Sequence, residues 1–156
     1  LDMVSTYLSD GNSAKLYRKL VDEQKMSLQV AAFNISLEEY GMYVILTLPL
    51  GETSLASLRD EIDEEIEKIQ TNLISQKDYE KLLNKFESNF VSSNASVEGI
   101  ANSLAEYYIF YDDTNLINSE IDIYRSITRE EIRDVAKKYL NSNQRLTLNY
   151  LPGSKK

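Results

Sequence analysis

The stretch LQVAAFNISLEEYGMYVILTL, residues 28–48, predicts an antiparallel β-hairpin. Its first half repeats with a period of two, as in a strand whose successive side chains face opposite sides. Its second half, residues 42–48, is β-branched and aromatic, which is typical of a returning strand. Residues 38–41 make a compact connection in which Gly41 is free to take a positive φ angle. Pro49 ends the second strand, where a missing backbone donor costs least.

Helical spacing dominates the sequence on both sides of this hairpin. Apolar residues recur three and four positions apart in residues 1–8 and 13–23, which predicts two short helices, the second capped by Ser13. Beyond the hairpin, Thr53 or Ser54 can cap a long helix, and the capping pattern around Thr128 predicts the last one. The helices expected there cover about residues 54–73, 75–90, 97–108, 119–124 and 128–140.

The final alternating segment, residues 145–151, predicts a third strand. Strands followed by a run of helices indicate an α+β fold, with helices layered on one face of an antiparallel sheet. A three-stranded sheet is narrow for so many helices, and the sequence opens at Leu1 without an initiator methionine. We therefore expect residues 1–156 to be a single domain of a larger multidomain protein, lacking one or more N-terminal strands.

The composition excludes several kinds of chemistry. The 156 residues contain no histidine and no cysteine, so they cannot build the usual zinc, copper or iron sites or a histidine-assisted nucleophile. A net charge of -8 argues against nucleic acid as a partner and fits either a solvated surface or a cavity that attracts cationic peptides. The longest apolar stretch, residues 42–50, is too short to cross a bilayer, which predicts no membrane span.

Three segments together resemble one protein family. Residues 10–20, DGNSAKLYRKL, resemble a G-x-x-S-R-L segment that is followed a few residues later by L-R-E. Residues 127–140, ITREEIRDVAKKYL, resemble the helix pattern I-T-x-E-D-I-x-x-V-A-x-K-Y-L, and residues 143–152 resemble a closing strand, N-R-x-x-L-x-Y-x-P. In this order and at these spacings, the segments are similar to the pitrilysin, or insulinase, type of zinc metallopeptidase over nearly the whole chain.

The resemblance implies a fold like one half of such a peptidase, as in the mitochondrial processing peptidase. Members of the family pair homologous α+β domains into a clamshell around a peptide-holding chamber. Zinc is bound in the first type of domain through the inverted motif H-x-x-E-H. This chain resembles the second, C-terminal type, which carries no zinc ligands. The resemblance thus implies no cofactor in this chain and zinc in another domain of the longer protein.

One departure from the family pattern concerns catalysis. Members that assist catalysis from the opposite half read L-R-x-x-x-x-L-x-Y, where Arg and Tyr contact the substrate or the oxyanion. Here Val21 stands in place of the Arg and Leu28 in place of the Tyr. We therefore expect that this domain comes from the half that does not supply these groups, or from a degenerate relative. No catalytic residue is transferred.

Two other clusters leave a choice between a site and ordinary structure. The acidic run of residues 60–67 is either a metal site or a solvated helix face with pairs such as Glu64 and Lys68, and we favour the helix face. The aromatic residues of 107–111 either line an interface or pack in the core, and we expect core for at least two of the four rings, Tyr107, Tyr108, Phe110 and Tyr111. The Gly11 loop and residues 92–94 are interpreted as helix ends, not as a phosphate cradle or a nucleophile. The sequence therefore predicts no catalytic, cofactor-binding or metal-binding residue.

The function expected is that of a non-catalytic domain of a zinc-dependent metalloendopeptidase, which forms part of the peptide-enclosing chamber and an interdomain surface. The alternative is a non-proteolytic scaffold or assembly subunit of the same family. Expected partners are the other domains of the parent peptidase and a peptide substrate, and the isolated chain is expected to self-associate through an unpaired sheet edge or exposed apolar surface. No signal peptide is recognised, so the compartment stays open between cytoplasm and, in a bacterium, periplasm.

Overall fold

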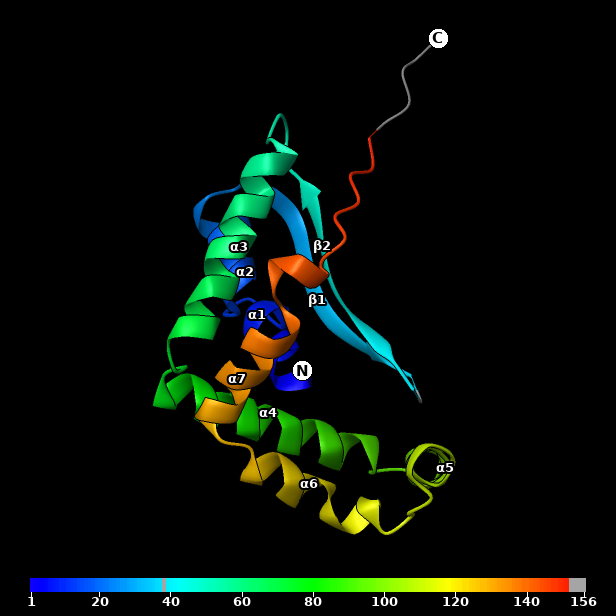
Figure 1. Ribbon diagram of the computed structural model, residues 1–156. Helices are drawn as coiled ribbons and strands as arrows, with labels where there is room; N and C mark the ends of the chain where they lie inside the picture. The colour runs from blue at the N-terminus through cyan, green and yellow to red at the C-terminus, as the bar shows by residue number, and fades with distance from the viewer. Residues whose placement is uncertain (38, 152–156) are drawn as a thin grey trace.

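The hairpin predicted by residues 28–48 forms the sheet of this protein. In the computed structural model, which describes residues 1–37 and 39–151, β1 (Ser27–Ser36) pairs antiparallel with β2 (Gly41–Pro49). The helices are α1 (Asp2–Ser9), α2 (Lys15–Tyr17), the π-helix η1 (Arg18–Glu23), α3 (Leu55–Thr71), α4 (Gln76–Ser93), α5 (Val97–Tyr111), α6 (Leu116–Ser126), α7 (Arg129–Tyr139) and the 3-10 helix η2 (Ser142–Gln144). Seven α-helices and a two-stranded sheet within the described residues confirm the α+β fold (Figure 1).

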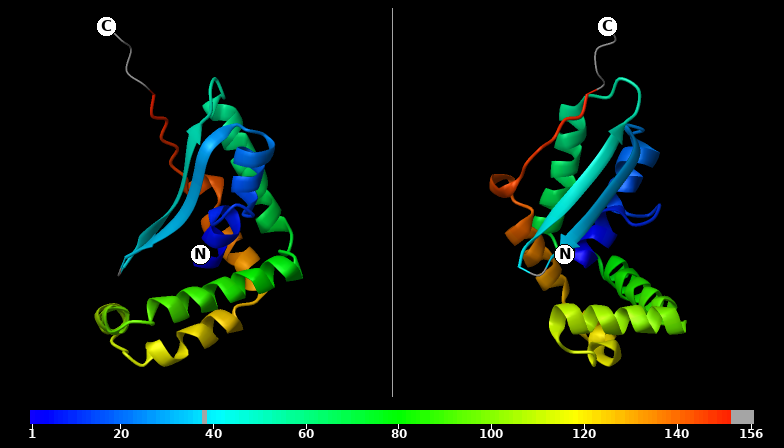
Figure 2. Two further views of the ribbon diagram at one scale, coloured as in Figure 1. Left: turned by 180° about the vertical axis from the view of Figure 1, so that it is seen from behind. Right: turned by 90° about the vertical axis from the view of Figure 1, so that its right-hand side faces the viewer.

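The helices cover one face of the hairpin and leave the other face bare (Figure 2). On the covered face, Val30 and Ala32 of β1 are buried in the hydrophobic core. On the opposite face, Phe33 of β1 and Leu46 and Leu48 of β2 are exposed. Both faces of the hairpin are therefore apolar, but only one is packed within the described part of the chain.

The core lies between the covered face of the hairpin and the helices. Leu8 of α1, Leu16 of α2, Leu20 of η1 and Leu58 of α3 all have no exposed surface. Truncation of one such leucine to alanine typically costs about 2–5 kcal/mol of stability. The short helices before the hairpin are thus held by tertiary packing, because they are too short to be stable alone.

The open side of β1 is closed by a serine of α1. The Ser9 hydroxyl accepts a hydrogen bond from the Ala32 N–H at 2.6 Å and donates one to the Ala32 carbonyl at 3.1 Å. A side chain therefore takes the place that a neighbouring strand would otherwise occupy. This clasp fixes α1 against the sheet and satisfies two backbone groups that would otherwise lack partners.

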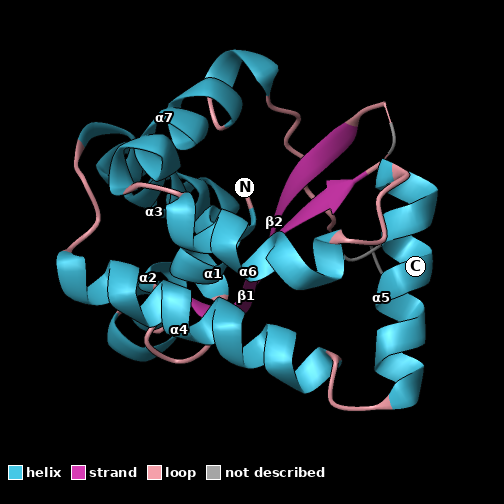
Figure 3. Ribbon diagram, turned by 90° about the horizontal axis from the view of Figure 1, so that it is seen from below, coloured by secondary structure: helices cyan, strands magenta, loops and turns pink. Residues whose placement is uncertain are grey.

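Four of the later helices begin with a capping hydrogen bond. Ser54, Ser75, Ser96 and Thr128 each accept a hydrogen bond from a backbone N–H one turn into the helix that follows, and the Ser96 cap was not predicted. The box at Thr128 is complete, because the Glu131 carboxylate accepts from the Thr128 N–H at 2.7 Å. This backbone hydrogen bond lowers the pKa of Glu131. Viewed from below, α5 stands apart from the main body and packs against α6 (Figure 3).

Three expectations about local structure were wrong. The described residues contain two strands, not three, because residues 145–151 find no strand to pair with and stay irregular. Ser13 does not cap the second helix: Ala14 precedes that helix, and the Ser13 hydroxyl accepts from Lys81 instead. Gly41 does not take a positive φ angle but lies so close to the Ile35 carbonyl that a side chain would collide with it. Of the predicted connection, Glu38 lies outside the described residues.

Candidate functional site

The acidic face of α3 gathers around one lysine from η1. Lys19 Nζ lies 2.7 Å from Glu61, 2.6 Å from Glu64 and 3.3 Å from Glu65. Lys68, on α3 itself, approaches Glu64 at 2.8 Å and Glu65 at 2.7 Å. The Lys19 side chain is only 13 % exposed, so this cation is partly withdrawn from water. The pairing of Glu64 with Lys68 that the sequence suggests is present.

Electrostatics in this network favour fully charged groups. Hydrogen bonds from Lys19 and Lys68 lower the pKa of Glu64 to about 2. Burial works against the charge of Lys19, but hydrogen bonds to Glu61, Glu64 and Glu65 raise its pKa. Two cations thus occupy the positions that a metal ion would need. Over residues 1–37 and 39–151, no group of acidic side chains is placed to hold a metal.

The two positions that depart from the catalytic pattern lie far from any reactive arrangement. Val21 lies in the π-helix η1 and packs against the core with its side chain half-buried. Leu28 is 61 % exposed on β1. Neither side chain carries a hydrogen-bond donor, so neither can stabilise a developing oxyanion.

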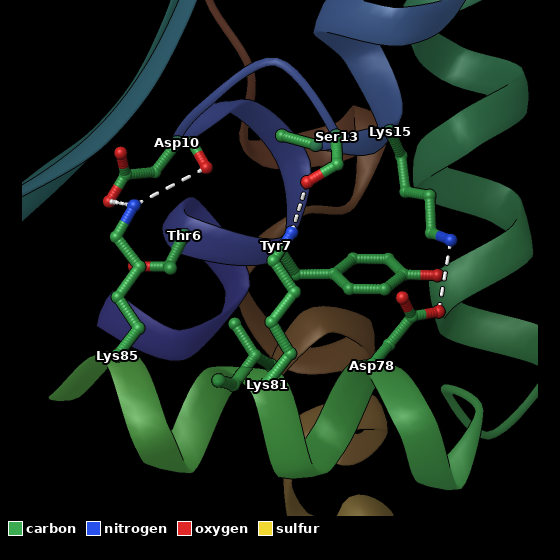
Figure 4. Close-up of a pocket in the computed structure, with 10 residues that line it drawn as sticks. Thr6, Tyr7, Asp10, Ser13, Lys15, Asp78, Lys81 and Lys85 are labelled. Atoms are coloured by element: carbon green, nitrogen blue, oxygen red, sulfur yellow. Dashed lines mark hydrogen bonds and ion pairs between the residues drawn. The ribbon is translucent and has the colours of Figure 1, made fainter. Parts of the chain in front are cut away.

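The loop after α1 is tied down by α4 through three lysine contacts (Figure 4). Lys85 pairs with Asp10 at 2.6 Å, Lys15 pairs with Asp78 at 2.9 Å, and Lys81 donates to Ser13. The cavity among these residues has a volume of about 20 Å³, room for about one water molecule. Such a space is too small for a substrate or a phosphate.

The same region contains one electrostatic shift and confirms a helix end. Burial and the nearby Asp78 carboxylate raise the pKa of Tyr7 to about 12. Gly11 has a φ angle of +89° directly after α1 ends, as expected of a glycine that terminates a helix. Residues 92–94 likewise separate α4 from α5. Both segments are therefore structural.

A larger apolar groove opens between the start of α1 and the helices α5, α6 and α7. Its volume is about 720 Å³, within the range typical of ligand sites. No sequence pattern predicts this groove, because its walls come from residues 1–4 and 107–138, which are far apart in the sequence. The lining residues are Leu1, Asp2, Met3, Val4, Tyr107, Tyr111, Leu116, Glu120, Ile123, Tyr124, Ile127, Glu131, Ile132, Asp134, Val135 and Lys138.

The aromatic cluster of residues 107–111 is more exposed than expected. Tyr107 is buried and its hydroxyl donates to the Glu120 carboxylate, but Tyr108, Phe110 and Tyr111 are all exposed. Burial and the Glu120 carboxylate raise the pKa of Tyr107. The expectation of at least two core rings is wrong, because in the described structure α5 packs mainly against α6 and leaves most of its rings without cover.

Fold and site together define an α+β domain whose described residues form no group of side chains placed to hold a metal. The family described as "Peptidase M16 inactive domain" matches residues 1–86. This match spans more than half of the 156 residues, and the chain belongs to that family. The resemblance drawn from residues 10–20 and the later segments is therefore confirmed at the level of the family.

Known proteins of this family are similar to the chain. "Zinc protease PqqE" of Helicobacter pylori is 24% identical over 148 residues, which are 95% of this chain and 33% of that protein. The inactive peptidase domain from Bordetella parapertussis has 22% identity and a TM-score of 0.85, covering 99% of this chain and 82% of that one. The periplasmic protease PqqL of Escherichia coli has 17% identity and a TM-score of 0.66, covering 88% of this chain and 15% of that one. The chain thus spans about one third of the length of its curated relative.

These findings place the chain among inactive domains whose homologues are zinc proteases. The residues present do not fit a zinc ion, since imidazole and thiolate are missing from the sequence and Glu61, Glu64 and Glu65 of α3 are paired with lysines. No helix in residues 1–37 and 39–151 has the length and apolar character that crossing a membrane requires.

Proposed function

We propose that this chain is a non-catalytic domain of a zinc-dependent metalloendopeptidase, forming part of the peptide-enclosing chamber and a surface for contact with other domains. The observation that carries the proposal is the match to an inactive peptidase domain in a chain without histidine or cysteine. Zinc would be held by another domain of the longer protein, here called the parent protein. The chain would contribute shape, apolar surface and charge, and no chemical step.

The finer fold proposal is that the parent protein completes the sheet with one or more strands outside residues 1–156, as in a half of the processing peptidase type. Two observations support it. Within the described residues β2 has a strand on one side only. The structurally similar domain from B. parapertussis is longer, since this chain covers 82% of it. Residues 1–156 would then be most of one domain.

The partners follow from the same proposal. The bare face of the hairpin and the exposed rings of α5 would contact other domains of the parent protein, and the peptide substrate would lie in the assembled chamber. The structurally similar E. coli protein is a periplasmic protease, which supports a periplasmic parent over a cytoplasmic one. We also propose that the isolated chain self-associates, through an unpaired sheet edge or through exposed apolar surface.

The direct test compares the isolated chain with the full parent protein in an assay with a quenched fluorescent peptide and added zinc. We expect turnover by the parent that is abolished when its zinc motif is mutated, and none by residues 1–156. As a control, the chain with Glu64→Gln and Glu65→Gln should give the same background. Turnover that follows the purified isolated chain through chromatography, and disappears in this control, would overturn the proposal.

A second candidate function is that of a non-proteolytic scaffold from the same family. It is favoured by Val21 and Leu28, which occupy the places of the Arg and Tyr donors. The same two residues are also expected if the chain comes from the half of a peptidase that does not supply the Arg and Tyr donors. The complete sequence of the parent protein distinguishes the two functions. An H-x-x-E-H motif elsewhere in that sequence supports the peptidase, and the absence of the motif supports the scaffold.

A further inference from the structure

The free side of β2 presents backbone groups without partners in the described structure. Ser9 binds the N–H and carbonyl of Ala32, so these groups point away from β2. Ala32 lies directly opposite Ile45 in the antiparallel pair. When the backbone N–H and carbonyl of one residue in such a pair point away from the partner strand, those of the residue opposite point away as well. The N–H and carbonyl of Ile45 therefore face the free side of β2. By alternation, those of Tyr43 and Thr47 do so as well.

This edge carries none of the usual protection against strand addition. Natural edge strands are blunted by charged residues, prolines, bulges or a covering element. Residues 41–48, GMYVILTL, contain no charge and no proline, and both faces of β2 are apolar. The edge of β1, by contrast, is blocked at Ala32 by the Ser9 clasp, and β1 packs against α1 and η1. Strand addition to this sheet is therefore directed to β2.

The same chain carries a segment that is ready to form a strand. Residues 146–151, LTLNYL, alternate apolar and polar side chains, and we call them the arm. Leu146, Leu148 and Tyr150 are 81%, 84% and 96% exposed. Arg145 pairs with Asp63 of α3 and fixes the root of the arm to the body. From that root the chain runs outward beside the upper part of the molecule (Figure 1).

We infer that the arm of one copy adds as a strand to the free edge of β2 in a second copy, with each chain both giving and receiving an arm. Six extended residues span about 20 Å, which fits within the roughly 26 Å of the eight uncharged residues of β2. A reciprocal exchange closes on itself about a twofold axis and occupies the free side of β2 in both copies. The second copy is the occupant because each chain supplies one open edge and one unpaired strand. The inference concerns the isolated chain and does not depend on the proposed peptidase.

The test measures mass by light scattering after size exclusion, from micromolar to about millimolar concentration. We expect residues 1–156 to shift from monomer to twice that mass as concentration rises. A version that ends at Arg145 should stay monomeric. Equal association by both versions would overturn the inference and assign it to the bare face of the hairpin, and a monomeric full chain throughout would overturn it too.

A matched pair of arm variants guards against misfolding, because the arm is exposed and contributes nothing to the core. Leu148→Lys should abolish the shift in mass, and Asn149→Lys, on the opposite face of the arm, should leave most of it.

Hydrogen exchange then locates the contact. The amides of Tyr43, Ile45 and Thr47 should be protected in the dimer and unprotected in the version that ends at Arg145. Protection of these amides in a monomeric full chain would show that the arm folds back on its own β2, and would overturn the exchange.

Discussion

Replacement of Lys19 by methionine tests the charge network of α3. Lys19 reaches from η1 to three glutamates of α3, and its side chain is 13% exposed. The most buried of these three glutamates is Glu65, whose side chain is 11% exposed. Exposed ion pairs are worth about 0–1 kcal/mol, and loss of one partner from a buried pair costs about 3–5 kcal/mol. A partly buried cation lies between these limits, and we expect Lys19→Met to lower the free energy of unfolding by about 1–2 kcal/mol.

The measurement is urea unfolding followed by circular dichroism, with Lys68→Met as the matched control. Lys68 is 52% exposed, so its loss should cost less than about 1 kcal/mol. For a chain of this size, the Lys19→Met effect corresponds to a fall in melting temperature of roughly 2–8 °C. Equal effects of the two substitutions would refute the argument that burial strengthens the contacts of Lys19.

The pH dependence of the same variant follows from the depressed pKa of Glu64. A carboxyl group whose pKa falls from 4.5 to about 2 on folding stabilises the protein above its unfolded pKa. This stability is lost as the pH falls from about 4.5 toward 2. In Lys19→Met one of the two cations that lower this pKa is gone, so the loss of stability over that window should be shallower. An unchanged slope would show that Lys19 does not hold Glu64 ionised.

Two further substitutions test the packing of the hairpin. Leu58→Ala should destabilise the protein by about 2–5 kcal/mol in chemical unfolding, because Leu58 has no exposed surface, and a loss below 1 kcal/mol would contradict its place in the core. Ser9→Ala should cost about 1–3 kcal/mol and speed hydrogen exchange at Ala32, because two backbone groups lose their partner. Exchange at Ala32 that stays as slow as in the unmodified chain would refute the clasp.

The sequence predicted those elements whose signal is local. The hairpin follows from the period of two in residues 28–36 and the β-branched run after it, because both faces of the ribbon are set by alternation alone. The starts of α3, α4 and α7 follow from capping serines and threonine, whose hydrogen bonds span only one turn. The absence of zinc ligands could be read directly from composition. These features required no knowledge of tertiary structure.

Features that join distant parts of the chain could not be predicted in this way. Lys19 meets glutamates more than forty residues away, and the Ser9 clasp spans 23 residues between a helix and a strand. Neither contact has a sequence pattern, since a lone lysine or serine is compatible with many surroundings. The groove at the start of α1 is likewise made by segments from opposite ends of the sequence.

Two of the failed predictions, the third strand and the core rings of α5, share one physical cause. An alternating segment becomes a strand only when another strand offers backbone partners, and an aromatic stripe becomes core only when another surface covers it. Residues 145–151 and the rings of α5 have the right patterns, but within the described chain they lack such partners. Both lie at apolar surfaces that stay open, as does the bare face of the hairpin around Leu46. These patterns are typical of a chain whose exposed apolar residues pack against another surface. This supports the proposal that a larger protein, or in its absence a second copy, provides the missing surface.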